Sequence, residues 1–142
     1  MNLADFEQNI INLLSQTFPE FTVESFPVKF EEYTFTSPVG CHLLKYNGTT
    51  FQKQETVWAV TQFSTVNYSV ITGFRGLQNY KEMHPVQTLL RDTLRGFEYE
   101  GKKIVLGSEE FLAEINGDLY VGLEFKIELF ETEGQDNDDI LV

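Results

Sequence analysis

The sequence predicts an α+β domain in which two helices pack on a largely antiparallel sheet. Residues 3–17 and a second stretch that begins near His84 repeat apolar side chains at three- and four-residue steps, which is the spacing of amphipathic helices. Residues 119–130 instead alternate apolar and polar side chains, as in a strand with one solvated face. Further strand-like segments precede and follow the second helix, and this order is typical of an α+β domain.

The N-terminal region predicts one helix, one short strand and an irregular segment. Pro19 ends the helix predicted over residues 3–17, because proline cannot continue a helix. Phe21 and Val23 alternate with polar residues and predict a short strand. Residues 26–38 contain two prolines and the acidic pair Glu31-Glu32, so we expect a surface loop or hairpin there.

Two longer strands are expected in the middle of the chain. The apolar run over residues 39–46 predicts a central strand that is covered on both faces. It ends at Asn47-Gly48, a pair that favours tight turns. Residues 57–72 are rich in aromatic and β-branched side chains and predict a long strand, bulged near Ser64-Thr65 and antiparallel to the first.

The second helix is expected to begin near His84-Pro85, since proline suits the first helical position. Gly96 is expected to end it. The apolar spacing places five residues on its inner face: Val86, Leu89, Leu90, Thr93 and Leu94.

The C-terminal third predicts three strands and an acidic tail. Residues 103–106 and 109–115 read as two short strands, and Asn116-Gly117-Asp118 is a turn that leads into the alternating strand over residues 119–130. Residues 131–142 are polar and acidic without periodicity, so we expect a mobile tail. The predicted organisation is therefore a single α+β domain over residues 1–130 followed by a disordered tail.

Composition and charge exclude several classes of function. Of the 142 residues, 22 are Asp or Glu and 10 are Lys or Arg, which gives a net charge of −12. This charge disfavours specific binding to a nucleic-acid backbone. Nothing approaches the roughly 20 consecutive apolar residues of a membrane-spanning helix, and no signal peptide is visible, so we expect no membrane contact and folding in a cytoplasm.

Residues suited to catalysis or metal binding are scarce. Cys41 and His42 are neighbours on a predicted strand and would point to opposite faces, so we interpret them as a buried thiol and a half-buried imidazole. His84 is expected to flank or cap the second helix. The carboxylate pairs Glu31-Glu32 and Glu109-Glu110 also alternate in direction if extended. The sequence thus predicts no catalytic residues, no cofactor and no metal site.

Four basic residues could form one positive patch on an acidic molecule. Arg91 and Arg95 lie one helical turn apart, and Lys102 and Lys103 follow a short turn later. In a monomer this patch is merely solvated, whereas in a homo-oligomer it faces the acidic surface of a neighbour. These four residues are therefore a candidate subunit interface.

Element order and local sequence resemble a family of phage proteins. The features that carry the resemblance are the strand Val39–Tyr46 ending in Asn-Gly, the long strand over residues 57–72, the helix segment Leu89–Gly96 and the final strand Leu119–Phe130. Together they resemble the tail terminator, or tail completion, proteins of contractile-tailed, Mu-type phages and prophages. The resemblance covers about residues 5–130 and involves no invariant motif.

The resemblance implies a non-enzymatic virion protein. Such a chain forms a ring, in this case a homo-hexamer, that caps the tail tube and joins the tail to the neck or head connector. Its partners would be tube and sheath proteins and the neck connector protein. It would reside in the tail or neck of the virion and in the host cytoplasm during assembly. DNA would pass through an acidic bore without being specifically bound.

Two alternatives remain open from the sequence. One is another ring protein of a phage neck or of a contractile secretion apparatus. The other is a small α+β ligand-binding domain, in which the many aromatic residues would surround an apolar pocket between sheet and helices.

Overall fold

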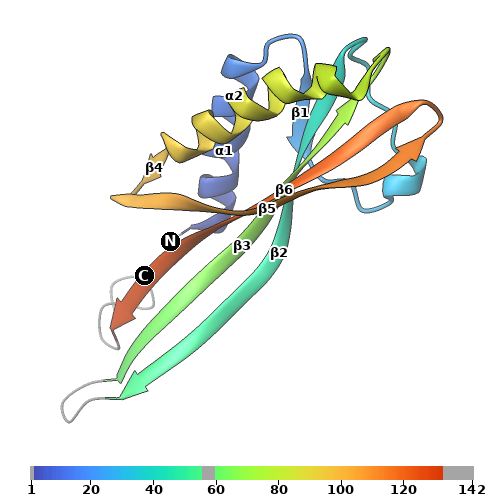
Figure 1. Ribbon diagram of the computed structural model, residues 1–142. Helices are drawn as coiled ribbons and strands as arrows, with labels where there is room; N and C mark the ends of the chain where they lie inside the picture. The colour runs from blue at the N-terminus through green and yellow to red at the C-terminus, as the bar shows by residue number, and fades with distance from the viewer. Residues whose placement is uncertain (1, 56–59, 133–142) are drawn as a thin grey trace.

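The fold is a six-stranded sheet with two helices, as the sequence predicts. A computed structural model describes residues 2–55 and 60–132 (Figure 1). The strand order is β1-β2-β3-β6-β5-β4; β1 pairs with β2 in parallel and all other pairs are antiparallel. The elements are α1 Leu3–Thr17, β1 Thr22–Ser25, the 3-10 turn η1 Phe30–Glu32, β2 Gly40–Glu55, β3 Val60–Phe74, the 3-10 turn η2 Tyr80–Glu82, α2 Met83–Arg95, β4 Glu98–Tyr99, β5 Lys102–Ile115 and β6 Asp118–Thr132.

Helix α1 has the bounds that the sequence predicts. The Asn2 side chain accepts a hydrogen bond from the Asp5 backbone N–H at 3.1 Å and so caps the first turn. The helix ends before Pro19, as expected. Its buried side chains recur at four-residue spacing: Phe6, Ile10 and Leu14.

Helix α2 begins at Met83, next to the predicted start, and ends at Arg95 with Gly96 as its C-cap, as expected, but its inner face differs from the prediction. The buried residues are Met83, Gln87, Leu90 and Leu94. Leu89, expected to face inward, is 45% exposed. Adjacent helical residues point about 100° apart, and α2 is oriented so that Leu90 faces the sheet while Leu89 points away from it.

Asn47-Gly48 forms a β-bulge and not the expected turn. Tyr46 pairs with Tyr68 and Gly48 pairs with Asn67, which leaves Asn47 as an extra residue in β2. Gly48 has a φ of +117°, a backbone conformation that glycine adopts without strain. Strand β2 therefore continues to Glu55, and the expected bulge near Ser64-Thr65 is wrong because the irregularity lies in the partner strand. Residues 57–59 lie outside the described part.

The C-terminal strands are longer than predicted. The two short strands expected over residues 103–106 and 109–115 are one strand, β5, whose register shifts between Leu106 and Glu109. The turn at Asn116-Gly117 is confirmed, with positive φ angles of 54° and 86°. Strand β6 runs to Thr132, so the first two residues of the predicted tail belong to the sheet. Residues 133–142 lie outside the described part.

The main core lies between the sheet and the two helices, which cover the same side of it (Figure 1). Side chains of alternate strand positions fill this layer, as the pattern of residues 119–130 predicts. Strand residues in the core are Leu44, Val66, Tyr68, Val70, Ile104, Leu123, Phe125 and Ile127. The fold is therefore built on one well-packed helix–sheet interface.

The opposite side of the sheet is covered only at one end. The loop after β1 places aromatic rings over Cys41, Leu43, Ile71 and Tyr120. Arg75 fastens this loop: its guanidinium donates to the carbonyl oxygens of Phe35 at 3.1 Å and Ser37 at 3.2 Å, and pairs with Asp118 at 3.3 Å. The covering rings are those of Phe26, Phe30, Tyr33 and Phe35. This second cluster leaves the rest of that face without a helix layer.

No helix in the described part of the chain is long and apolar enough to cross a membrane.

The two adjacent leucines of α2 provide a test of this packing. Leu90→Ala should lower the free energy of unfolding by about 2–5 kcal/mol, because Leu90 is fully buried against the sheet. Leu89→Ala should change it by no more than about 0.5 kcal/mol, because Leu89 is 45% exposed and lies outside the core clusters. Urea denaturation of both variants measures the difference; equal losses would contradict this orientation of α2.

Candidate interaction surface

Three strands extend beyond the helices and form the most distinctive surface of the protein. We call this segment the arm and define it as residues 49–55 of β2, 60–66 of β3 and 127–132 of β6. Figure 1 shows β2, β3 and β6 running on together past α1 and α2. The strand pairings continue along its length, from Thr49 opposite Val66 to Glu55 opposite Val60. The arm is therefore regular sheet that runs on past the helices, and only its base, at Val66 and Ile127, belongs to the helix-covered core.

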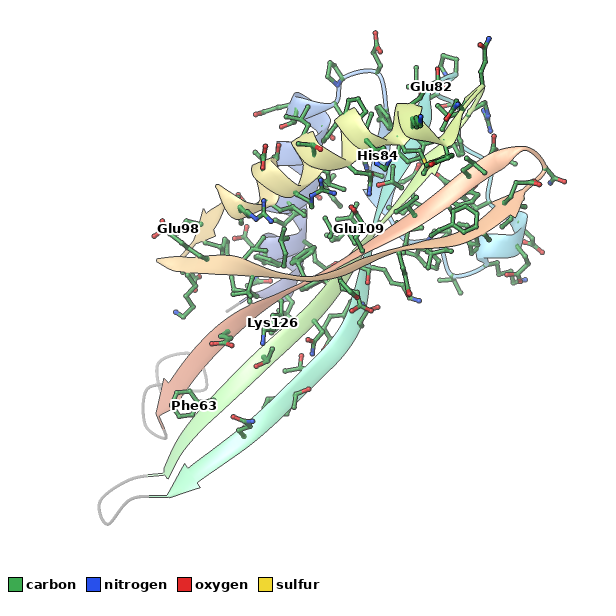
Figure 2. The ribbon with its side chains drawn as sticks, viewed as in Figure 1. Phe63, Glu82, His84, Glu98, Glu109 and Lys126 are labelled. Carbon is green, nitrogen blue, oxygen red and sulfur yellow. The ribbon has the colours of Figure 1, made fainter. Side chains whose placement is uncertain are left out.

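Aromatic side chains lie on both faces of the arm. Phe51 pairs with Ser64 on the helix side of the sheet and is 61% exposed. Phe63 is the next residue along β3, so it points to the other face, and it is 38% exposed. Figure 2 shows Phe63 far from the labelled residues of α2 and β5. Large exposed aromatic side chains on a projecting sheet are typical of a protein contact surface.

Tyr68 anchors the base of the arm to α1. Its ring lies 5.3 Å from the ring of Phe6, 5.5 Å from that of Tyr46 and 5.5 Å from that of Phe125. Its hydroxyl donates a hydrogen bond to Glu7 at 2.9 Å. Burial and the Glu7 carboxylate together raise the pKa of Tyr68 above its usual value. The phenol therefore stays neutral and fixes where the arm leaves the body.

The uncovered face of the sheet next to the arm is hollowed and polar. Two neighbouring hollows there share Asn47 and Glu124. The Asn47 amide donates to the Ser69 hydroxyl at 2.6 Å, and the Ser108 hydroxyl donates to Glu124 at 3.1 Å. The other lining residues are Lys45, Asn67, Tyr68, Ser69, Ile71, Gly107, Glu110, Leu112, Gly122, Phe125 and Lys126. This mixture of amides, hydroxyls and both charges suits a polar protein contact.

The four basic residues of the sequence hypothesis lie around the C-terminal end of α2 and the start of β5. Arg91 is engaged within the fold: its guanidinium contacts Glu109 at 2.6 Å. Arg95 pairs with Asp92 on the same helix at 3.5 Å. Lys102 and Lys103 begin β5, where they pair with β4. Of the two arginines, only Arg95 keeps a side chain that is more than half exposed.

Cys41 and His42 lie on opposite faces of β2, as predicted, but the imidazole is fully buried and not half-buried. It packs between the rings of Phe18 and Phe21, at centroid distances of 4.4 and 4.6 Å. Its Nδ1 lies 2.8 Å from the hydroxyl of Thr72. Its Nε2 has no hydrogen-bond partner among the described residues. Burial lowers the pKa of His42 to about 3, so the ring stays neutral and structural.

The remaining candidate groups are spread over the surface. His84 is exposed in the first turn of α2, where its ring lies 6.0 Å from that of Tyr80. Figure 2 shows His84 and Glu109 on different elements, α2 and β5. Glu109 pairs with Leu123 and Glu110 with Gly122, so the two carboxylates point to opposite faces as expected. Within residues 2–55 and 60–132 there is no group of three or more His, Cys, Asp or Glu side chains that would hold a metal ion.

Comparison with known families relates this architecture to phage biology. A family model described as Gp37 protein matches residues 10–141, nearly the whole chain. The chain belongs to the Gp37 family. This is a phage-associated family, so the phage relationship expected from the sequence is confirmed. No curated protein matches this Gp37-family chain.

Sequence reasoning missed the arm of this Gp37-family protein. The Asn47-Gly48 pair is typical of the end of a strand, and the polar residues that follow it resemble a loop. The available signal was the β-rich composition of Thr49, Thr50 and Phe51, which continues the strand beyond the glycine. Thr50, Phe51 and Gln52 are all exposed, so this part of β2 has no buried side that would produce an alternating pattern, and periodicity therefore cannot reveal it.

His42 should make the protein sensitive to acid. The folded pKa of about 3 lies below the ordinary value of 6.5, so the unfolded chain binds a proton that the folded chain refuses. The contribution of His42 to the free energy of unfolding is therefore fully present above pH 6.5. It falls as the pH drops towards 3, by up to about 1.4 kcal/mol per pH unit. Urea denaturation between pH 4 and 7 should show a shallower pH dependence for His42→Gln; parallel curves would contradict this assignment.

The Cys41 thiol should be inert in the native protein. It is fully buried, and burial raises its pKa to about 12, so almost no thiolate forms at neutral pH. Ellman's reagent should react with Cys41 only after denaturant is added. Rapid reaction under native conditions would show that the aromatic loop covering Cys41 moves away from the sheet.

Proposed function

We propose that this Gp37-family chain is a phage tail terminator that forms a ring, caps the finished tail tube and joins the tail to the neck or head connector. The role is structural and needs no catalytic residue or cofactor. The ring would be a hexamer that contacts tube and sheath proteins on one side and the connector protein on the other. The observation that carries the proposal is the arm, a regular extension of the sheet past the helices in a phage-associated family.

The two sides of the sheet support an assembly role. One side is filled by the helices, and the other has a polar, hollowed region beside the arm. A subunit of a closed ring must carry two unlike surfaces, one for each neighbour, and further surfaces for its axial partners. The arm and the polar face offer such surfaces without disturbing the core.

The acidic charge fits a channel for DNA. The net charge of −12 per subunit would give a ring a strongly negative surface wherever acidic residues line the bore. Phosphate groups would be repelled and not retained, so DNA would pass without specific binding. The protein would reside in the virion neck and, before assembly, in the host cytoplasm.

The ligand-binding alternative has less support. An apolar pocket between sheet and helices would need open space there. That layer is filled by side chains that are 0–2% exposed: Phe6, Ile10, Leu14, Tyr68, Leu90, Leu94 and Phe125. A different ring protein of a phage neck or a contractile secretion apparatus shares the same physical requirements, and the experiment below distinguishes it.

Deletion of the gene provides the direct functional test. Loss of a terminator should give tails of irregular length that do not join heads, and expression of the full chain should restore both properties. Electron microscopy of the tails measures length and head attachment. A neck protein of another kind would leave tail length uniform, and this result would contradict the terminator role.

Self-association provides the second measurement. Light scattering at low and high salt should show a mass approaching six times the 16.4 kDa of one chain, and the mass should rise with salt because salt screens repulsion between acidic subunits. A chain that is monomeric in solution but forms rings on added tail tubes also supports the proposal. A monomer that binds no tail at any salt concentration contradicts it.

A further inference from the structure

We propose that neighbouring subunits join through their arms, with the β2 edge of one copy pairing in parallel with the β6 edge of the next. The proposal rests on the ring proposed above and specifies which surfaces meet within it. The arms would then form one continuous sheet around the ring. The proposal is based on the two outer strands of the arm, β2 and β6. Within the described residues, the outer edge of each has backbone groups that pair with no neighbouring strand.

The first open edge belongs to β2. Strand β1 pairs with β2 only from Cys41 to Leu44, and the backbone N–H of Phe26 makes one further bond, to the Leu44 carbonyl. From Lys45 to Glu55, β2 has β3 as its single strand partner within the described residues. The backbone groups on its outer side are therefore available to another strand.

The second open edge belongs to β6. Strand β5 pairs with β6 from Asp118 to Ile127, where Ile104 is its last partner. From Glu128 to Thr132, β6 pairs only with β3 within the described residues. The open edge of β6 has five residues, and the open edge of β2 beyond the bulge has seven. The two edges lie on opposite sides of β3. The two edges have comparable lengths and lie on the same arm.

The two edges differ in charge, which favours pairing of unlike edges. The β2 segment over residues 45–55 contains two lysines and one glutamate, whereas the β6 segment over residues 128–132 contains two glutamates and no base. Pairing of one β6 edge with another would bring like charges together and is disfavoured. Contact between unlike edges repeats from subunit to subunit, and such a head-to-tail contact closes into a ring.

The register across the arm sets the direction of the new pair. Thr50, Thr65 and Glu128 lie in one row, because Thr50 pairs with Thr65 and Thr65 with Glu128. Strands β2 and β6 are both antiparallel to β3, so they run in the same direction. In a ring whose axis runs along the arm, rotation from one copy to the next leaves the strand direction unchanged. The β2 edge of one copy and the β6 edge of the next would therefore form a parallel pair. The Thr50 and Glu128 side chains of neighbouring copies would share one face.

A monomer with open strand edges must avoid aggregation through those edges. Open edges template aggregation unless charge or a bulge blunts them. Both devices are present here: the bulge at Asn47-Gly48 lies in β2 just before the arm, and β6 contributes acidic residues to its edge. Repulsion between the net negative charges of separate subunits adds a barrier that a tail tube or high salt can lower.

A matched pair of charge variants tests the contact. Thr50→Glu adds an acid to the β2 edge opposite the acidic β6 edge and should weaken self-association about two- to fivefold per contact. Thr50→Lys changes the same exposed position to the opposite charge and should leave association equal or stronger. Light scattering at fixed salt measures both. Equal effects of the two variants would contradict a contact at this edge.

Cysteine cross-linking tests which edges meet. The double variants Thr50→Cys/Glu128→Cys and Gln52→Cys/Glu128→Cys cover two registers on one face, and oxidation should give a ladder of linked subunits in at least one of them. The single variants should give no ladder. Dimers from Thr50→Cys alone would reveal symmetric β2–β2 pairing and overturn the proposal. The buried Cys41 thiol does not compete.

Hydrogen exchange tests whether the β2 and β6 edges pair, whatever the strand register between neighbouring subunits. Peptides covering residues 49–55 and 128–132 should both exchange more slowly in assembled protein than in the monomer, because new strand bonds protect outer-edge amides. Rings in which neither segment gains protection would overturn the strand pairing and leave the terminator role intact. A chain that neither self-associates nor binds tails would count against both proposals.

Discussion

Tyr68 marks the position where the helix-covered body of the protein becomes an arm. Its ring packs against α1 through Phe6 and against neighbouring strands through Tyr46 and Phe125. Its hydroxyl is bound to Glu7, so one side chain holds α1, β2, β3 and β6 in fixed relative positions. A tyrosine can do this because its ring is apolar and its far end is a hydrogen-bond donor. The direction of the arm depends on this contact.

The two faces of the sheet differ in how far they are covered, and this difference relates the fold to its proposed role. The helices and the sheet bury a continuous apolar core on one side, whereas the polar face beside the arm carries no helix layer. Sheet without such a layer can make contacts with other chains. Open strand edges require devices that prevent premature pairing, and the bulge at the base of the arm and the acidic residues of β6 are two of them. In the proposed ring, assembly and solubility would depend on the same few residues.

Elements with one buried and one solvated face were predicted well, because burial on one side imposes a readable period. Helix α1 and strand β6 follow this rule over most of their lengths. The errors have physical causes. Asn47-Gly48 suits both a tight turn and a bulge, and only pairing with β3 selects the bulge. Leu89 and Leu90 are equally apolar, and only the position of α2 on the sheet determines which one is buried.

The sequence by itself determined the α+β class, the two helices, the turn at Asn116-Gly117 and the separation of Cys41 from His42, since each depends on local periodicity or on backbone preferences of a few residues. Only the tertiary structure decided that His42 is wholly enclosed, that Arg91 binds Glu109 and that three strands extend beyond the helices. These features depend on which distant segments meet. Such contacts leave no period in the sequence, because the residues that form them are far apart along the chain.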